Sequence, residues 1–434
     1  MNPLTRECLD RTFLLMRDEV TDDVSDETLF TALHSTDVVL TGDAENLSSH
    51  AAQCALVTGA LLMARSAHRV YLDVPDLPLV GLQPPLKPTT LVSSLADIGR
   101  DLLPGVEFLV GAPQRTVDLG VVFGDSVPRS AARASFTVNA SAWSAYLQSL
   151  SHASRWHERH WPFGGLAAGA LVAGEAFKLS MRKLRHFARV PGMFDKVFAP
   201  TIDTRFDIAP PETPRTAALG TFDFVSGGAI ANAVLSCLGR IPSVAGKGRI
   251  VEDSVSDYSN LNRYSLLRRS RVSARKVDTL LEVDLGELQL TSAPVRFDEQ
   301  SVGELLPLAP RVLVGVDHIP TRWFVQRLQP TWLGIGATTH WNAMASIHER
   351  ELACAGCLHP RDDPADTPIP TAAFVSFWSG LLLAAYFVRA AGSGMFGRRE
   401  QQVFLTPMRP ESVWWSPVAR HRDCPVCGGQ LRAA

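Results

Sequence analysis

The sequence predicts an α/β protein made of two similar halves. Three observations predict this fold class. Apolar segments of strand length and of helix length alternate along the chain, a proline-rich break interrupts them near the middle, and a glycine-containing turn follows the first strand after that break. The chain has 434 residues, of which 46% are hydrophobic and 20% charged. A chain of this length and composition can fold into two or three globular domains.

The charge balance and the N-terminal sequence exclude several function classes. Because 42 basic residues nearly balance 44 acidic ones, we expect no general electrostatic attraction to nucleic acid or to an anionic membrane. Met1–Leu15 carries charges throughout and does not resemble a signal peptide, so a cytoplasmic location is expected. The apolar segment Ala372–Val388 is predicted to be a buried helix rather than a membrane span.

The first half, residues 1–206, is predicted to be a degenerate α/β domain. Its expected strands are 37–41, 69–74, 119–123 and 134–138, and its expected helices are 47–67 and 164–184. The turn after the first strand lacks a glycine pair and carries the carboxylates of Asp43 and Glu45, where a nucleotide-binding domain would receive phosphates. This half therefore repeats the plan of a nucleotide-binding domain without its chemistry.

Residues 207–216 are predicted to be a linker, because Ile-Ala-Pro-Pro-Glu-Thr-Pro can continue neither a helix nor a sheet. The second domain, 217–434, begins with a Rossmann-like unit of alternating elements. We expect a strand over 221–225, a tight turn over 226–229, a helix over 230–240 and a strand over 248–252. A later apolar helix over 372–391 is the counterpart of the helix over 164–184 in the first half.

The turn is a reduced glycine-rich motif, in which Ser226 and Ala231 replace the outer glycines and Gly228 remains. Four charged residues after it suit ATP chemistry. Glu252 ends the second strand and can accept both ribose hydroxyls. Arg263 and Lys276 supply positive charge for the triphosphate, and Asp317, after the strand over 311–316, can hold a magnesium ion. Taken singly each could be a surface charge or a helix cap; their combination favours a site.

Four of the seven cysteines form two C-x-x-C pairs, Cys354 with Cys357 and Cys424 with Cys427. This arrangement is typical of a four-thiolate zinc site, in which each pair points both sulfurs at one ion. A redox pair is the alternative. Because all four ligand positions would be filled by protein, such a zinc would be structural and would offer no open position to substrate.

With these motifs the sequence resembles the adenylating enzymes of the ThiF/MoeB type, which activate ubiquitin and ubiquitin-like sulfur carriers. The resemblance covers about Thr221 to Gly429. It rests on the Gly227-Gly228 turn, Glu252, the Ser259–Arg263 segment, Lys276, Asp317 and the four cysteines. The resemblance implies ATP and magnesium at Gly227, Gly228, Ala229, Glu252, Asn260, Arg263, Lys276 and Asp317, with catalytic roles for the last three and a structural zinc.

The resemblance also implies that an active and an inactive adenylation domain pair within this one chain. Three departures stand against the family pattern. Glutamate replaces the usual aspartate at Glu252, and Ser254 stands where a second aspartate is common, although Asp253 and Asp257 are close by. The loop over 359–371 lacks the nucleophilic cysteine that many members carry. Only Cys8, Cys54 and Cys237 remain for a thioester, so we expect the reaction to stop at the acyl-adenylate.

The expected reaction is ATP-dependent adenylation of the C-terminal carboxylate of a ubiquitin-like β-grasp protein, with a conjugating enzyme as a second partner. The resemblance extends to bacterial ubiquitin-like conjugation systems, some of which act in defence against phage. Two alternatives stay open. One is a peptide adenylyltransferase similar to the microcin-maturing enzymes, which need no catalytic cysteine. The other is a catalytically inactive scaffold that binds a ubiquitin-like protein.

Overall fold

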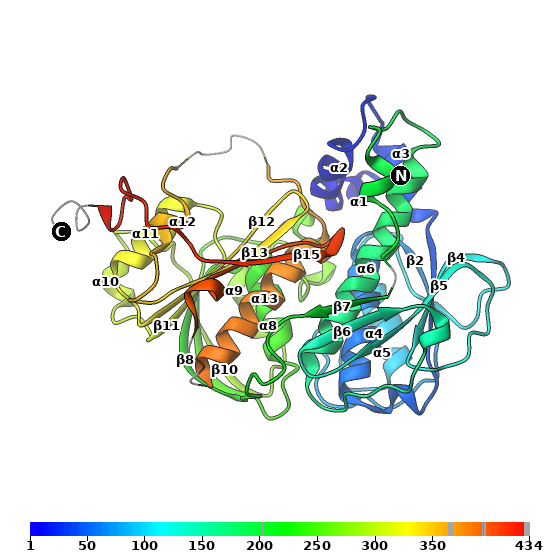
Figure 1. Cartoon of the computed structure of the whole chain (residues 1–434), viewed down its shortest axis with the longest axis horizontal. Coiled ribbons are helices and arrows are strands. Elements are labelled where there is room, and N and C mark those ends of the chain that lie inside the picture. The colour runs from blue at the N-terminus through cyan, green and yellow to red at the C-terminus, as the bar shows by residue number, and fades with distance from the viewer. Residues whose placement is uncertain (202, 363–367, 393, 395, 429–434) are drawn as a thin grey trace.

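The computed structural model describes residues 1–428 except 202, 363–367, 393 and 395. It consists of two α/β halves that lie side by side (Figure 1), with the first half on the right and the second on the left. Two short helices at the N-terminus lie above the junction of the halves in this view. Each half is built on its own β-sheet, so the predicted α/β class is confirmed.

The first sheet has seven strands in the order β3-β2-β1-β4-β5-β6-β7. Its strands are β1 (Asp37–Thr41), β2 (Arg69–Asp73), β3 (Leu109–Val110), β4 (Val117–Phe123), β5 (Ala132–Ala140), β6 (Ser144–Gln148) and β7 (Thr204–Asp207). The strands from β3 to β5 pair in parallel, whereas β6 and β7 are antiparallel to their neighbours. A parallel pair needs a crossover connection. The helices over 50–65 and 91–99 provide it between β1 and β2 and between β2 and β3, whereas the segment 124–131 between β4 and β5 carries no helix.

The second sheet has eight strands in the order β10-β9-β8-β11-β12-β13-β14-β15. They are β8 (Ala218–Val225), β9 (Ala245–Val251), β10 (Glu287–Ala293), β11 (Arg311–Val314), β12 (Trp332–Thr339), β13 (Asn342–His348), β14 (Gln402–Thr406) and β15 (Arg409–Ser416). The first seven repeat the order and the parallel or antiparallel pairing of β1–β7, so the internal repeat is confirmed at the level of topology. β15 is an addition at the edge.

The α-helices of the first half are α1 (Pro3–Cys8), α2 (Asp10–Arg17), α3 (Asp26–His34), α4 (His50–Arg65), α5 (Leu91–Gly99), α6 (Pro162–Leu184) and α7 (Phe194–Val197). Those of the second half are α8 (Ala229–Leu238), α9 (Lys276–Leu281), α10 (Val302–Leu305), α11 (Ile319–Arg327), α12 (Ala355–Leu358) and α13 (Ala373–Ala391). No helix or strand is assigned over 208–217, the segment that joins the two sheets and overlaps the expected linker.

Four helices form the junction of the two halves. α4 packs against α6, α8 packs against α13, and α6 and α13 pack against each other. Glycines permit this close approach: a Cβ on Gly169 of α6 would lie 2.5 Å from the Ala55 carbonyl oxygen of α4, and a Cβ on Gly380 of α13 would lie 3.0 Å from the Val234 nitrogen of α8. The same small-residue contact is thus made once in each half.

α13 is long and apolar enough to cross a membrane, but 89% of its most apolar window is buried inside the protein. Its aromatic side chains pack in the core, with Phe374 5.3 Å from Phe177 and Phe387 5.0 Å from Phe222 between ring centroids. The helix therefore serves as a core element between the sheet and the other half, as the sequence predicts.

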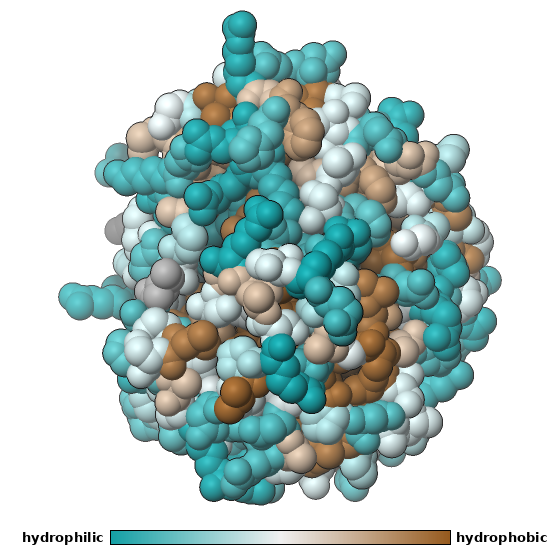
Figure 2. All heavy atoms as spheres, turned by 90° about the vertical axis from the view of Figure 1, so that its right-hand side faces the viewer, coloured by the Kyte–Doolittle hydropathy of each residue, from teal (hydrophilic) through white to brown (hydrophobic). Residues whose placement is uncertain are grey.

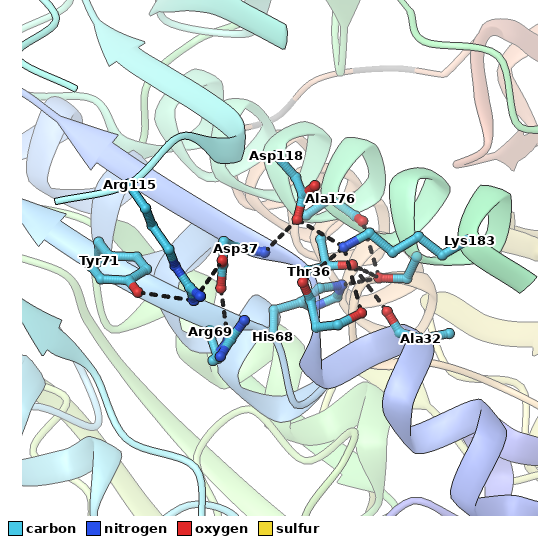
Figure 3. A network of polar contacts seen from close by, with 12 residues as sticks. Ala32, Thr36, Asp37, His68, Arg69, Tyr71, Arg115, Asp118, Ala176 and Lys183 are labelled. Atoms are coloured by element: carbon cyan, nitrogen blue, oxygen red, sulfur yellow. Dashed lines mark hydrogen bonds and ion pairs between the residues drawn. The ribbon is translucent and has the colours of Figure 1, made fainter. Parts of the chain in front are cut away.

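A polar network fastens α6 to the amino ends of the strands in the first half (Figure 3). Asp118 accepts hydrogen bonds from Lys183 of α6 (2.8 Å) and from the main-chain nitrogen of Asp37 (3.0 Å). The Asp37 carboxylate in turn is paired with Arg69 and Arg115 (2.7 and 2.8 Å). These contacts lie at the sheet edge opposite the one where ligands bind in such folds. We interpret this network as structural.

The outer face of the first half is mostly hydrophilic (Figure 2), and apolar side chains occur there in separate groups. Val110 and Val127 are exposed apolar residues of the first half. Scattered apolar side chains of this kind are normal on a protein surface.

Candidate active site

A cavity of about 330 Å³ opens at the carboxyl ends of the central parallel strands of the second sheet. This is the edge at which open α/β sheets bind ligands. Its walls come from the ends of β8 and β9 and from the segments after β9, β10 and β11. Of the residues predicted from the sequence, Gly228, Ala229, Glu252, Arg263, Lys276 and Asp317 line this cavity.

The turn between β8 and α8 brings the main chain close to the cavity. A Cβ on Gly227 would lie 2.9 Å from Cγ of Glu252 and 3.0 Å from Cβ of Lys276, so only glycine fits there. Ser226 has a φ of 148°, a conformation that favours glycine. Its Oγ accepts a hydrogen bond from the Gly228 nitrogen (2.9 Å). Serine at this first motif position therefore keeps the glycine-like turn at a cost in strain, a common feature of functional sites.

Glu252 is held in place by the turn and by its own loop. One carboxylate oxygen accepts from the Gly227 nitrogen (2.9 Å), and the other accepts from Oγ (2.6 Å) and the nitrogen (3.1 Å) of Ser254. Burial disfavours the ionised form, but the positive charge of Lys276 and these hydrogen bonds outweigh it, so the pKa of Glu252 lies below its ordinary value. Glu252 is therefore ionised at neutral pH and able to accept further hydrogen bonds.

Arg263 and Lys276 flank one aromatic ring. The Arg263 guanidinium carbon lies 5.6 Å, and the Lys276 Nζ 5.8 Å, from the centroid of Tyr264. Arg263 also donates to the Ser259 carbonyl oxygen and to Oδ1 of Asn262 (3.0 Å), which fixes its side chain. The two cations are thus oriented at the cavity wall by their surroundings.

Asp317 is an exposed residue on the segment after β11 and borders the cavity. The buried Arg322 of α11 donates twice to the Val316 carbonyl oxygen, at 3.0 and 2.8 Å, next to Asp317 in the chain. A third donor of Arg322 contacts Nε2 of His359 at 2.8 Å. The main chain that carries Asp317 is therefore anchored, while its carboxylate remains accessible to a ligand.

Gly227 and Asn260 do not line the cavity, although both are expected there from the sequence. Gly227 is buried behind the turn and acts through its hydrogen bond to Glu252. Asn260 is 4% exposed, and its side chain accepts from the Asp257 nitrogen (3.2 Å) and so caps the 3₁₀ turn over Tyr258–Asn260. Both residues support the walls in this structure.

Arg11, Arg296 and Phe297 are among the wall residues that sequence reasoning missed. Arg11 belongs to α2, near the N-terminus of the chain, and reaches the cavity of the second half. Arg296 and Phe297 come after β10 and lie at the same wall as Val295. No local pattern could identify Arg11, because only the folding back of the N-terminal helices brings it there. Arg296 and Phe297 could have been found, because residues just after each parallel strand are natural candidates for the ligand-binding edge.

A second cavity of about 500 Å³ adjoins the first one. Both are lined by Arg11, Asp317, His318, Thr338 and Ile369. The second cavity extends over β12–β14, where Asn342, Met344 and Phe404 line it. A ligand in the first cavity and another in the second would meet beside Asp317.

The corresponding edge of the first sheet is differently built. The side chain of Leu47 occupies the space beside Gly42, where a Cβ would lie 2.5 Å from it. Asp43 and Asp125 lie around the Asn46 amide, and Asp73 at the end of β2 is buried against Arg129. Of the two carboxylates predicted to disfavour phosphates, Asp43 accepts from the Asn46 amide at this edge, and Glu45 is ion-paired with Arg155.

The four cysteines of the C-x-x-C pairs form one cluster in which all sulfurs lie within 4.8 Å of one another. Cys354 Sγ is 3.7 Å from Cys357 and 3.4 Å from Cys424, and Cys357 Sγ is 3.4 Å from Cys427. Tetrahedral zinc with bonds of about 2.3 Å requires sulfurs roughly 3.8 Å apart. The cluster fits zinc and is too open for disulfides, whose sulfurs are about 2.05 Å apart.

Parts of the chain are similar to known proteins. The family model described as "BilD N-terminal domain" matches residues 37–190, all within the first half. Two crystal structures of E. coli MccB are similar to the chain. The structure with AMPCPP and MccA has 13% sequence identity and a TM-score of 0.42, and the match covers 68% of this chain and 98% of that one. The structure with ATP has 16% identity and a TM-score of 0.39, and the match covers 60% of this chain and 85% of that one. No curated protein matches.

The predicted role of Glu252 in ribose binding is testable with nucleotides that lack the ribose hydroxyls. We expect Glu252→Ala to weaken ATP binding about tenfold, the usual effect of losing hydrogen bonds to a charged group. The same substitution should leave the weaker binding of 2′,3′-dideoxy-ATP unchanged, because that analogue cannot use the carboxylate. Titration calorimetry measures both affinities. An equal loss for both nucleotides would mean that Glu252 acts only by holding the Gly227 turn.

Proposed function

We propose that the chain uses ATP to adenylate the C-terminal carboxylate of a small protein or peptide. One observation supports this most: Glu252, Arg263, Lys276 and Asp317, scattered over the second half of the sequence, line a single cavity at the ligand-binding edge of a parallel sheet. Glu252 suits the ribose, and the two cations suit the triphosphate. The adjoining second cavity suits the substrate carboxylate.

In the proposed reaction, a carboxylate oxygen of the substrate attacks the α-phosphorus of ATP. The bond from that phosphorus to the oxygen bridging the β-phosphorus breaks, and pyrophosphate leaves with its electron pair. Arg263 and Lys276 would stabilise the charge that develops on the phosphates, and Arg11 could add to them. Asp317 would hold a magnesium ion that neutralises phosphate charge next to the substrate carboxylate.

We infer that the preferred substrate is a ubiquitin-like β-grasp protein, with a conjugating enzyme as acceptor, in a bacterial-type conjugation system. This preference rests on the sequence resemblance to ThiF/MoeB-type enzymes over Thr221–Gly429. The BilD N-terminal domain model matches residues 37–190 of the other half. A peptide substrate is the second candidate, because the described loop residues contain no nucleophilic cysteine beside the cavity. The similar E. coli MccB is crystallised together with MccA.

We further propose that the first half is an inactive adenylation domain and that the cysteine cluster holds a structural zinc. The repeated topology and the carboxylates at the first sheet's edge support the former. The sulfur distances support the latter.

Incubation of the full chain with ATP and each candidate substrate tests the choice of substrate. Mass spectrometry should detect an AMP adduct on the C-terminus of a ubiquitin-like β-grasp protein and none on the same protein with an amidated C-terminus. An adduct on a short peptide with a free C-terminus, together with none on the β-grasp protein, would favour the second candidate. No adduct on either, despite ATP binding, would favour a scaffold.

A second expectation concerns the thioester. Cys8, Cys54 and Cys237 are all buried, and burial raises the pKa of Cys8 to about 12, so its thiolate is scarce at neutral pH. Cys54 has a lowered pKa, because the adjacent His50 outweighs burial, but it is 0% exposed. We therefore expect the native chain to form no thiol-sensitive adduct with its substrate. An adduct on a non-reducing gel that disappears in Cys54→Ser or Cys8→Ser would contradict this expectation.

A further inference from the structure

Arg65 is the last residue of α4 in the first half, and its side chain is fully buried at the junction with the second half. Its guanidinium crosses the junction. Nη1 donates to the carbonyl oxygen of Leu261 (2.6 Å), and Nη2 donates to those of Ser265 (3.1 Å) and Leu267 (2.7 Å). A single side chain of one half thus satisfies three main-chain acceptors of the other. Buried carbonyl oxygens need such partners.

The segment held by Arg65, Leu261–Leu267, carries two residues of the candidate active site. Arg263 and Tyr264 line the cavity, and the acceptors of Arg65 lie on both sides of them in the chain. The segment contains no α-helix or strand that would fix its main chain by regular hydrogen bonds. Turn hydrogen bonds from the nitrogens of Arg263 and Tyr264 to the Asn260 carbonyl oxygen (3.1 and 2.9 Å) order its start. Arg65 adds donors to the carbonyl oxygens at both of its ends.

Other first-half groups also contact this part of the second half. The buried Asn262 side chain donates to Oγ1 of Thr12 (3.0 Å). Beyond the segment, the Asp101 carbonyl oxygen accepts from the Arg269 nitrogen (2.7 Å), and the Asp101 carboxylate accepts from the Ser270 nitrogen (2.8 Å). The contact from Thr12 holds only the side chain of Asn262, and the contacts of Asp101 lie after Leu267. Arg65 instead binds the main chain on both sides of Arg263.

The second half has a reciprocal contact. Arg240, just after α8, is 2% exposed and donates to the carbonyl oxygen of Pro84 (2.6 Å) and to Oε1 of Gln83 (3.1 Å) in the first half. The two arginines occupy equivalent places. Arg65 ends α4, which connects β1 and β2, and it binds the segment after β9 of the second half. Arg240 follows α8, which connects β8 and β9, and it binds the segment after β2 of the first half. The Gln83–Pro84 segment carries no residue of the candidate active site. Arg240 is therefore a matched control within the same chain.

We propose that Arg65 is a positioning residue for the nucleotide site, which holds the Leu261–Leu267 segment so that Arg263 points into the cavity. This inference rests on the proposed function, since it takes ATP as the ligand of Arg263. It assigns the first half a direct part in nucleotide binding by the second half.

The test compares Arg65→Lys and Arg65→Met with Arg240→Lys and Arg240→Met in the full chain. ATP affinity is measured by titration calorimetry, and amide hydrogen exchange is measured over 261–267 and 82–86. The Arg65 variants should weaken ATP binding by about tenfold or more and speed exchange over 261–267, with lysine milder than methionine. The Arg240 variants should speed exchange over 82–86 and change ATP affinity less than about twofold.

Two outcomes would overturn the proposal. One is an equal loss of ATP affinity in the Arg65 and Arg240 variants, which would mean that both arginines only stabilise the junction. The other is faster exchange over 261–267 with unchanged ATP affinity. If the methionine variant fails to fold, the lysine pair still decides. A wild-type chain that binds no ATP would instead refute the proposed function, and the exchange data would then still show whether Arg65 orders the segment.

Discussion

Asp317→Ala should reduce adenylation by roughly a thousandfold, the size of effect seen when a group that stabilises transition-state charge is removed. Asp317 lies on the anchored segment after β11, beside the point where the two cavities meet. Without its carboxylate, the cavity would lose the residue that would hold magnesium, the ion that would neutralise phosphate charge beside the reacting carboxylate. Pyrophosphate exchange measures this loss, while the affinity for ATP without magnesium should change little.

Two neighbouring acids serve as comparisons for Asp317. Asp257 is exposed in the loop after β9, where it caps the turn over Tyr258–Asn260, and it does not line the cavity. Asp257→Ala should therefore retain most of the exchange activity. Asp253 does line the cavity, so a moderate loss in Asp253→Ala would identify it as a further metal ligand. A larger loss in Asp253→Ala than in Asp317→Ala would show that the metal is assigned to the wrong residue.

The purified chain should contain one zinc ion, and Cys424→Ser should lose it. Thiolate ligands provide much of the folding free energy of small zinc sites. We expect the melting temperature of the second half to fall by about 10 °C, which corresponds to roughly 3 kcal/mol for a domain of this size. Metal content is measured by elemental analysis and unfolding by calorimetry.

Loss of zinc should also lower the adenylation rate, through a chain of contacts. Cys357 belongs to α12, which is followed by His359, and His359 contacts the same Arg322 that holds the Val316 carbonyl beside Asp317. Cys237→Ser is the control, because it changes a buried thiol outside the cluster. It should keep the full zinc content. A Cys424→Ser chain with normal zinc content would contradict the four-cysteine site.

The strands and long helices of the fold could be predicted because their signals are local. The strand over 37–41 has the bounds expected from its apolar run, and α6 and α13 differ from expectation by one or two residues. The predicted helix over 47–67 instead begins as a 3₁₀ turn and becomes α4 at His50, because Ser49 caps it by accepting from the Ala52 nitrogen (3.2 Å). Capping, rather than the apolar pattern, sets such boundaries.

The residues of the candidate site that follow strands could be predicted from the sequence. The residues that reach the site across the junction of the two halves could not. Glu252 and Asp317 lie after β9 and β11, as a parallel sheet requires. Arg11 and Arg65 come from the first half, and no spacing in the sequence relates them to Arg263. Asn260 lies in the right segment, but its side chain serves the turn instead of the cavity. Contacts across a junction are tertiary information that a linear pattern does not hold.

ATP–pyrophosphate exchange by the full chain tests the central claim most directly, with and without a ubiquitin-like β-grasp protein and alongside Asp317→Ala. Our account predicts exchange that requires the free C-terminus of that protein and disappears in the variant. No exchange with that protein or with a peptide, by a chain that binds both zinc and ATP, would contradict adenylation and leave a nucleotide-binding scaffold as the function.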